Sequence, residues 1–186
     1  WLLDTLLRNG YRAILLEAHS LGEGQTLASQ GIIHGGLKYA DRGAARVLSA
    51  MPNRWRACLK DSAEPHLGTV QKRDESCYLW YPRDARFVGL QLWAGSFLSP
   101  SKFALVSGVE RPQPLRDWPG KVARINELVI DPRSLIQALY ERNRGYVLKY
   151  DLNAGFEMMG SGGMVTAVRI EVKDMPGGVV IKPKRV

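Results

Sequence analysis

The sequence predicts an α/β protein with a parallel sheet, and two neighbouring patterns support this fold class. Residues 1–9, WLLDTLLRN, place apolar side chains at helical spacing, and Asn9-Gly10 is a typical helix end. A strand-length apolar run, YRAILLEA at 11–18, follows directly, as expected for a parallel strand buried on both faces. A helix, a short loop and a strand together form the second half of a βαβ unit.

The remainder of the chain predicts further helices and strands in mixed order. Asp131 and Pro132 have the residue types of an N-cap and a first helical position, so a helix is expected from there to Gly145. The other expected helices are 41–60, with a kink near Pro52, and 84–98.

The expected strands are the two ends of 69–81, a possible strand within the proline-rich connection 107–120, 121–130, and three late apolar runs, YVLKYDL, MVTAVRIEV and GVVIKPKRV. Glycine-rich turns at 160–163 and 176–178 are expected to separate the last three strands.

Composition narrows the class of protein. The chain has 186 residues, 45% of them hydrophobic and 24% charged, which is enough to build a core. The net charge of +8 is spread along the chain without a run of five like charges. Nucleic-acid binding needs a concentrated basic patch, so this distribution argues against it and leaves an anionic small ligand open.

The two cysteines, Cys58 and Cys77, stand far apart without a CxxC pair or a histidine cluster. This predicts neither a disulfide framework nor a metal site, and a reduced, cytoplasmic location is the expectation. No apolar run approaches the roughly 20 residues that span a bilayer, and the start lacks the pattern of a signal peptide.

Glu17 ends the apolar run and is the first candidate for ligand binding. In a dinucleotide-binding βαβ unit, an acidic residue at the end of the second strand accepts hydrogen bonds from ribose hydroxyls. It follows the first glycine of the phosphate-binding turn by about 20 residues, which would place that turn before Trp1. Because the glycine fingerprint is not in the sequence, a plain surface glutamate is the alternative reading of Glu17.

The loop GQTLASQGIIHGGLKY, at 24–39, has the composition of a phosphate and ring contact. Small residues let backbone N–H groups approach a phosphate, and the hydroxyls of Thr26 and Ser29 can donate to the same group. Gly35-Gly36 would leave room for a flat ring. His34 either faces that ring or is a hydrogen-bonded core histidine.

The stretch LLEAHSLGEGQTLASQGIIHGGLKY resembles the FAD-dependent oxidoreductases of the D-amino-acid oxidase superfamily. Its loop is most similar to those of L-2-hydroxyglutarate and glycerol-3-phosphate dehydrogenases. A second match is INELVIDPRSLIQALYERNRGYVL, at 125–148, where the family has an acidic-x-x-hydrophobic-Asp-Pro element that opens a helix and returns the chain to the FAD domain.

The resemblance implies a cofactor site for FAD. Its expected residues, from the adenosine ribose through the pyrophosphate to the isoalloxazine, are Glu17, Ala18, His19, Thr26, Ala28, Ser29, Gln30, Gly31, His34, Gly35 and Gly36. The catalytic residue stays unknown, with His34 the candidate nearest the flavin. Candidates for the substrate pocket, or alternatively for ordinary packing, are Trp80, Tyr81, Arg83, Arg86 and Trp93.

With the resemblance, the fold class becomes a partial Rossmann-like FAD-binding domain with an inserted α+β segment of a substrate domain. The expected boundaries are 1–48 and 125–186 for the FAD-binding domain and 49–124 for the substrate segment. We expect a fragment that lacks the GxGxxG turn and the C-terminal half, and is inactive by itself.

The expected activity is hydride transfer from an amino acid, a 2-hydroxy acid or a polyol phosphate to flavin N5, as oxidase or dehydrogenase. The expected partner is an anionic small molecule, bound without nucleic acid or a transmembrane segment. The alternatives are a nicotinamide-dependent enzyme and a non-enzymatic basic binding module on a Rossmann-like core.

Overall fold

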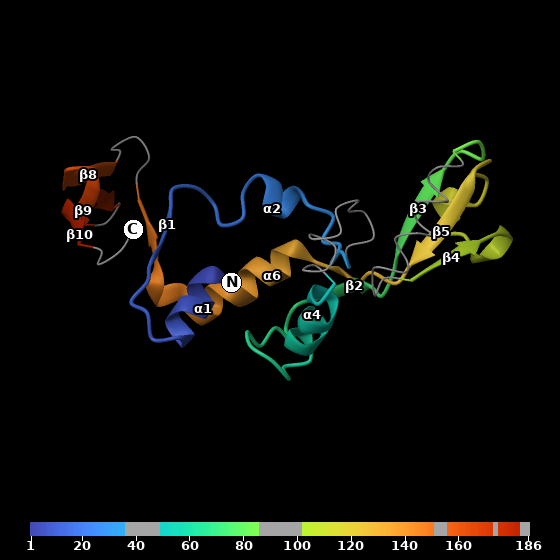
Figure 1. The fold of residues 1–186 in the computed structure, drawn as a ribbon, viewed down its shortest axis with the longest axis horizontal. Helices are drawn as coiled ribbons and strands as arrows, with labels where there is room; N and C mark the ends of the chain where they lie inside the picture. Colours follow the sequence, from blue (N-terminus) through green and yellow to red (C-terminus); the bar gives the residue numbers. More distant parts are fainter. Residues whose placement is uncertain (36–48, 86–101, 151–155, 173–174, 183–186) are drawn as a thin grey trace. The chain divides into compact units, whose positions relative to one another are not determined.

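The computed structural model describes residues 1–35, 49–85, 102–150, 156–172 and 175–182, in which helices and strands alternate irregularly (Figure 1). The chain divides into two compact units, which we describe separately: Trp1–Gln25 with Leu139–Val186, and Thr26–Ala138. The boundaries expected from the sequence, 48 and 125, stay a prediction. No helix among the described residues is long and apolar enough to cross a membrane.

The first unit opens with the predicted helix and strand. Helix α1 (Leu2–Arg8) ends at Asn9, and Gly10 follows with a φ of 78°, a left-handed conformation that favours glycine. Strand β1 (Leu15–Glu17) pairs in parallel with β7 (Val147–Lys149), which places Glu17 opposite Lys149. The helix and the parallel pairing are therefore confirmed.

The predicted burial of this strand is wrong. Only three residues of 11–18 form the strand, and Ile14 and Leu15 are 41% and 39% exposed. The reason is the number of neighbours: in the described part of the chain, β1 hydrogen-bonds to β7 alone. An apolar run shows only that the side chains of a strand are suited to burial. Whether they are buried depends on the elements that pack around the strand.

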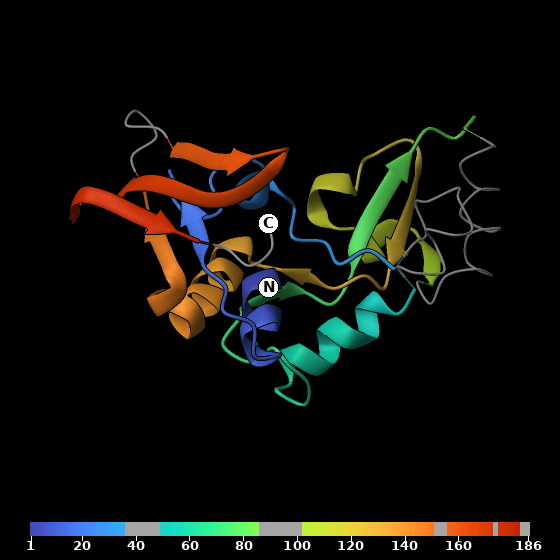
Figure 2. The ribbon, with the colours of Figure 1, turned by 60° about the vertical axis from the view of Figure 1, so that its left-hand side comes forward.

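The last three strands form an antiparallel sheet in the order β10-β9-β8 (Figure 2). Strand β8 (Phe156–Ser161), which the sequence analysis missed, joins β9 (Met164–Val172) through Gly162 and Gly163. Both glycines have positive φ, 61° and 80°, as a two-residue type I′ turn requires. The predicted turn at 160–163 is confirmed.

The turn expected at 176–178 is wrong, because these residues lie within β10 (Met175–Ile181). The pairing with β9 shifts register between Met175 and Val179. Gly177 and Gly178 adopt φ values of 92° and 70°, so the two glycines make an irregularity inside the strand instead of ending it.

The second unit contains α2 (Gln25–Ala28) at its boundary and α4 (Met51–Leu59), which begins with Pro52 in its first turn. The structure thus places Pro52 at a helix start, where its missing N–H costs nothing, and not at a kink. The prediction for residues 41–48 lies outside the described residues, as does the helix expected at 84–98 except for Asp84 and Ala85, which are not helical.

Strands β3 (Cys77–Tyr81), β5 (Lys121–Ile125) and β4 (Phe103–Val106) form an antiparallel sheet in that order (Figure 1). Its core is a cluster of Tyr81, Ala123 and Ile125, with Phe103 packed against it. Beside it, β2 (Lys72–Asp74) pairs with β6 (Val129–Ile130). The strands expected in 69–81 and 121–130 are confirmed, while β4 was not predicted.

The proline-rich connection forms two 3₁₀ turns, η1 (Gly108–Glu110) and η2 (Gln113–Leu115), and contains no strand. Pro112 and Pro114 have no N–H group to give to a ladder. The connection is held by a side chain: the guanidinium of Arg111 donates to the carbonyl oxygens of Trp118 at 2.6 Å and Gly120 at 3.0 Å. This arginine is thus committed to holding the connection.

Helix α6 (Pro132–Asn143) begins as predicted and continues into η3 (Arg144–Tyr146). The N–H of Ser134 donates to Asp131 Oδ2 at 2.9 Å, so Asp131 is the N-cap. Arg73 donates to the other carboxylate oxygen at 2.9 Å, and these hydrogen bonds lower the pKa of Asp131. The cap therefore also ties the helix start to β2.

The segment before α6 pairs with the small-residue loop. The N–H of Ile33 donates to Leu128 O at 2.9 Å, and the N–H of Ile130 donates to Gly31 O at 3.0 Å. Gly31 has a φ of 70°, and a Cβ there would lie 2.1 Å from the backbone oxygen of Ile130. Only glycine fits this close approach.

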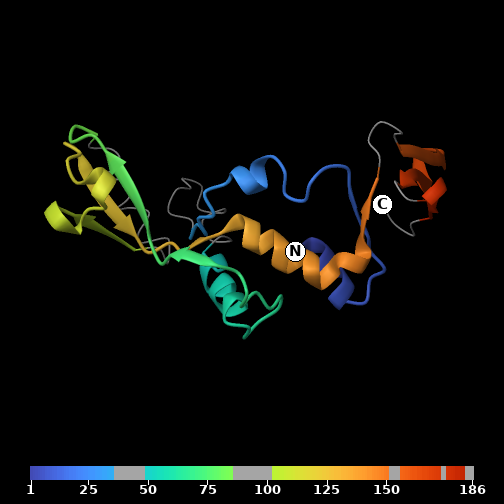
Figure 3. The same cartoon turned by 180° about the vertical axis from the view of Figure 1, so that it is seen from behind.

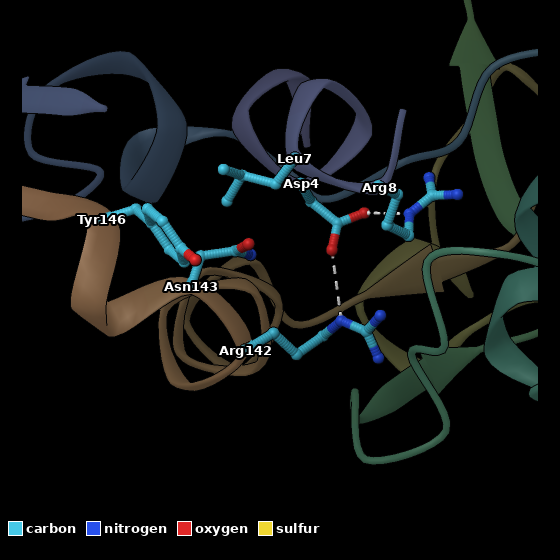
Figure 4. A pocket seen from close by; sticks show the side chains of 6 residues that line it. All are labelled: Asp4, Leu7, Arg8, Arg142, Asn143 and Tyr146. Carbon is cyan, nitrogen blue, oxygen red and sulfur yellow. Dashed lines mark hydrogen bonds and ion pairs between the residues drawn. The ribbon is translucent and has the colours of Figure 1, made fainter. Parts of the chain in front are cut away.

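Within the first unit, α1 lies beside the C-terminal end of α6 (Figure 3). Asp4, only 2% exposed, accepts hydrogen bonds from Nε of Arg8 at 2.9 Å and Nε of Arg142 at 3.3 Å (Figure 4). Burial opposes ionisation of this carboxyl, but the two arginines outweigh it and lower the pKa of Asp4. The three side chains line an open cavity of about 450 Å³.

We expect Asp4→Asn to lower the free energy of unfolding by about 1–3 kcal/mol at pH 7, because both arginines lose a charged acceptor. The folded-state pKa of Asp4 is depressed, so its contribution is present above the ordinary carboxyl pKa of about 3.9 and is lost as the pH falls through the folded-state pKa. Denaturant unfolding of wild type and variant from pH 7 to pH 3 measures this gap. Asp117→Asn, at an exposed aspartate, is the control. A gap of constant size across this range would contradict the assignment.

Gly31→Ala and Gly10→Ala form a matched pair, since both glycines have a positive φ but only Gly31 faces a clash. Each substitution carries the cost of left-handed backbone, about 1–2 kcal/mol. We expect Gly31→Ala to lose roughly a further 1–3 kcal/mol, since its Cβ must displace the strand that holds Ile130. Unfolding curves of the two variants measure the difference, and equal losses would show that the pairing tolerates a side chain.

Candidate functional site

The centre of the candidate site is Glu127, a glutamate between β5 and β6 that is 2% exposed. Its Oε1 accepts the backbone N–H of Gly35 at 2.8 Å, and its Oε2 lies 2.9 Å from Nδ1 of His34. The thiol of Cys77, at the start of β3, lies 3.9 Å from the same Oε2. A carboxylate out of water needs such donors, because burial without partners is costly.

The loop that carries the predicted cofactor residues has two different halves. Residues 24–30 are exposed apart from Leu27, and Ser29 Oγ donates to Thr26 O at 2.8 Å within this half. Ile33 and Gly35 are buried, and their N–H groups are occupied by Leu128 and Glu127. The first half therefore has exposed side chains, while the backbone of the second half is hydrogen-bonded to Leu128 and Glu127.

His34 lies in the second half of the loop, between the buried residues Ile33 and Gly35, and its side chain is 28% exposed. The sequence left two readings of this residue, a ring contact and a hydrogen-bonded core histidine. The structure has one feature of each: Nδ1 is hydrogen-bonded to a buried carboxylate, as in a core histidine, while the side chain is partly exposed, as a ring contact requires. In the part of the chain that the structure describes, Nε2 has no hydrogen-bond partner.

The ribose candidates lie in the first unit. Glu17 Oε1 accepts the N–H of His19 at 2.9 Å, and Lys149 Nζ donates to His19 O at 2.8 Å. Glu17 Oε2 makes no hydrogen bond to any described residue, and the residue is half-buried at the end of β1. One carboxylate oxygen thus shapes the turn through Ala18, and the other is available to a hydroxyl group.

The other predicted residues have diverse surroundings. Tyr81 is buried in the sheet core, Arg83 is exposed, and Trp80 is 52% exposed with an edge contact to Trp118 at 4.7 Å between ring centroids. Gly36, Arg86 and Trp93 lie outside the described residues. Within the described ranges, no group of three His, Cys, Asp or Glu side chains could hold a metal ion.

Sequence reasoning missed the roles of two residues. Glu127 belongs to the acidic-x-x-hydrophobic-Asp-Pro element, but its partner His34 is 93 positions away, and no local pattern joins them. Lys149 was available from the sequence, because a parallel pair of 15–17 with 147–149 places it opposite Glu17. To place Lys149 opposite Glu17, the register of the pairing has to be known as well as the positions of the two strands.

The chain resembles known proteins over most of its length. A family model described as FAD dependent oxidoreductase (DAO) matches residues 3–151. A protein of Pseudomonas aeruginosa described as the probable FAD-dependent oxidoreductase PA4991 is 40% identical in an alignment of 147 residues that covers 76% of this chain. The crystal structure of PA4991 matches 91% of this chain with a TM-score of 0.64 and 32% identity.

Two further crystal structures share the fold at 14–15% identity. They are L-proline dehydrogenase from P. horikoshii, with a TM-score of 0.65 over 97% of this chain, and glycine oxidase from Bacillus cereus, with a TM-score of 0.63 over 97%. The chain covers 37% of the curated relative and 40%, 46% and 48% of the three structures. The family match, the curated relative and its structure agree, and the chain belongs to the FAD-dependent oxidoreductase family whose cofactor is FAD.

Proposed function

We propose that the full-length protein is an FAD-dependent oxidoreductase whose cofactor contacts residues of the segment from Glu17 to Gly36. One observation carries the proposal: a buried glutamate fixes the His34-Gly35 step at the end of an exposed run of small residues. The proposed domain is partly Rossmann-like, because β1 and β7 form a parallel pair with Glu17 at the carboxyl end of β1.

The donors and acceptors of the described residues fit FAD. Glu17 Oε2 is an acceptor without a partner in the described chain, as a ribose hydroxyl requires. Thr26, Ala28, Ser29 and Gln30 are exposed and small or polar, which suits the pyrophosphate and ribityl path. Gly35 cannot give its N–H to the cofactor, because Glu127 accepts it, so we propose that Gly35 contributes space near the ring.

When bound, FAD would supply a hydride acceptor for a C–H bond that carries an amine or hydroxyl group. The chain's own residues would bind and orient the cofactor and exclude water. His34 is the candidate beside the reacting centre, and a catalytic role for it is part of the proposal.

We propose an amino acid as the first substrate class to test. Two of the solved relatives are named for proline and glycine, although identity near 15% establishes the fold alone. A 2-hydroxy acid or a polyol phosphate, suggested by the likeness of the loop to L-2-hydroxyglutarate and glycerol-3-phosphate dehydrogenases, is the second class. All three classes carry an anionic carboxylate or phosphate group, for which arginine is suited. Arg111 is an unsuitable clamp because backbone carbonyls occupy its guanidinium.

The full-length protein is expected to purify with flavin absorbance that bleaches when a substrate is added without oxygen. A panel of small L- and D-amino acids, 2-hydroxy acids and glycerol phosphates identifies the class, and reoxidation by air separates oxidase from dehydrogenase. A full-length protein that neither retains nor rebinds FAD would contradict the proposal. Binding of a nicotinamide dinucleotide in place of FAD would favour the alternative, a nicotinamide-dependent enzyme.

Glu17→Gln is expected to weaken FAD binding by roughly 10- to 100-fold, the value of hydrogen bonds to a charged acceptor. The change removes charge at the proposed ribose contact while keeping the size of the side chain. Titration of apoprotein with FAD, followed by flavin fluorescence, measures the dissociation constant. Glu23→Gln is the matched control, because Glu23 follows Glu17 by only a few residues and, among the described residues, accepts only the N–H of Ser20. Equal effects of the two variants would exclude a specific role for Glu17.

A further inference from the structure

The two oxygens of Glu127 face two donors that differ in kind. The N–H of Gly35, 2.8 Å from Oε1, is a backbone group that can only donate. Nδ1 of His34, 2.9 Å from Oε2, belongs to a ring whose proton can sit on either nitrogen. A carboxylate only accepts, so the proton of this contact must be on Nδ1.

This contact has a consequence for the far side of the ring. In a neutral imidazole, a proton on Nδ1 makes Nε2 an acceptor. Nε2 has no partner in the described chain, and the side chain is partly exposed. The carboxylate itself is held from both sides, because Gly35 fixes Oε1 and the weak thiol donor of Cys77 lies beside Oε2.

We propose that Glu127 is a positioning residue, which holds His34 as the Nδ1–H tautomer and presents Nε2 as a hydrogen-bond acceptor to the cofactor or substrate. The proposal rests on the proposed function for what Nε2 would contact, but not for the tautomer. A neutral acceptor at this place would bind an N–H or O–H group of a ligand. The opposite tautomer would present a donor and repel the same group.

Glu127→Gln tests the inference because an amide has one acceptor and one donor in place of two acceptors. The backbone N–H of Gly35 cannot change its role, so the amide oxygen is expected to turn toward it. The amide NH₂ then faces Nδ1, which must accept, and the proton of His34 moves to Nε2. The variant should thus reverse the tautomer while the loop stays paired.

The measurement is the ¹⁵N spectrum of histidine rings in full-length protein labelled on histidine. His34→Gln identifies the signals of His34, and two-bond ¹H–¹⁵N correlations at pH 8.5, about two units above the ordinary imidazole pKa, show which nitrogen carries the proton. We expect Nδ1–H in wild type and Nε2–H in Glu127→Gln. Cys77→Ala, which removes the weak thiol contact and leaves both oxygens of Glu127 in place, is the control and should keep Nδ1–H.

Wild-type protein with the proton on Nε2, or on both nitrogens, would overturn the inference even where a variant does not fold. An unchanged tautomer in folded Glu127→Gln would overturn it as well. In the flavin-loaded enzyme, the variant should lose roughly 10- to 100-fold in kcat with little change in KM, as outer-shell partners of other sites do. Failure to bind flavin contradicts the proposed function. The ¹⁵N spectrum of the ring tests whether Glu127 sets the tautomer of His34, with or without bound flavin.

Discussion

The small-residue loop depends on one buried carboxylate. Glu127 is almost fully removed from water, and leaving such a group without partners costs several kcal/mol. Two of its donors come from residues 34 and 35, more than 90 positions earlier in the chain. The segment that directly follows Glu127, residues 128–130, also pairs with the backbone of residues 31–33. The charge and the backbone ladder thus fix one another, and the His34 step cannot move without breaking both.

This anchoring explains why the loop needs glycines in two different ways. Gly31 allows the backbone of Ile130 to approach more closely than any side chain permits, which makes the pairing possible. Gly24, whose φ is 81°, has open space around it, so its role is conformational freedom alone. The exposed half of the loop is therefore shaped by local conformation, and the fastened half is shaped by a distant strand.

Sequence reasoning succeeded where the cause is local. The helix at 1–9 with its Asn9-Gly10 end, the Asp131 cap and the Gly162-Gly163 turn each depend on a few neighbouring residues, and each is confirmed. It failed for the burial of 11–18, because burial depends on how many elements surround a strand. The partners of Glu127 were equally out of reach, since a separation of 93 residues carries no periodic signal. What the sequence did supply for the candidate site was the list of residue types, without the contact that organises them.

Glu17, at the end of β1, and Glu127, in the connection between β5 and β6, differ in the hydrogen bonds that they make. Glu17 uses one oxygen to hold the N–H of His19 and leaves the other without a partner in the described chain, so it keeps capacity for a ligand. Both oxygens of Glu127 accept hydrogen bonds from protein donors, Gly35 on Oε1 and His34 on Oε2. A carboxylate oxygen without a protein donor can accept from a ligand hydroxyl directly, whereas a buried carboxylate that holds protein donors acts through those groups. We therefore propose that the same residue type is a ligand contact in one unit and a support in the other, and that the hydrogen bonds already made decide which.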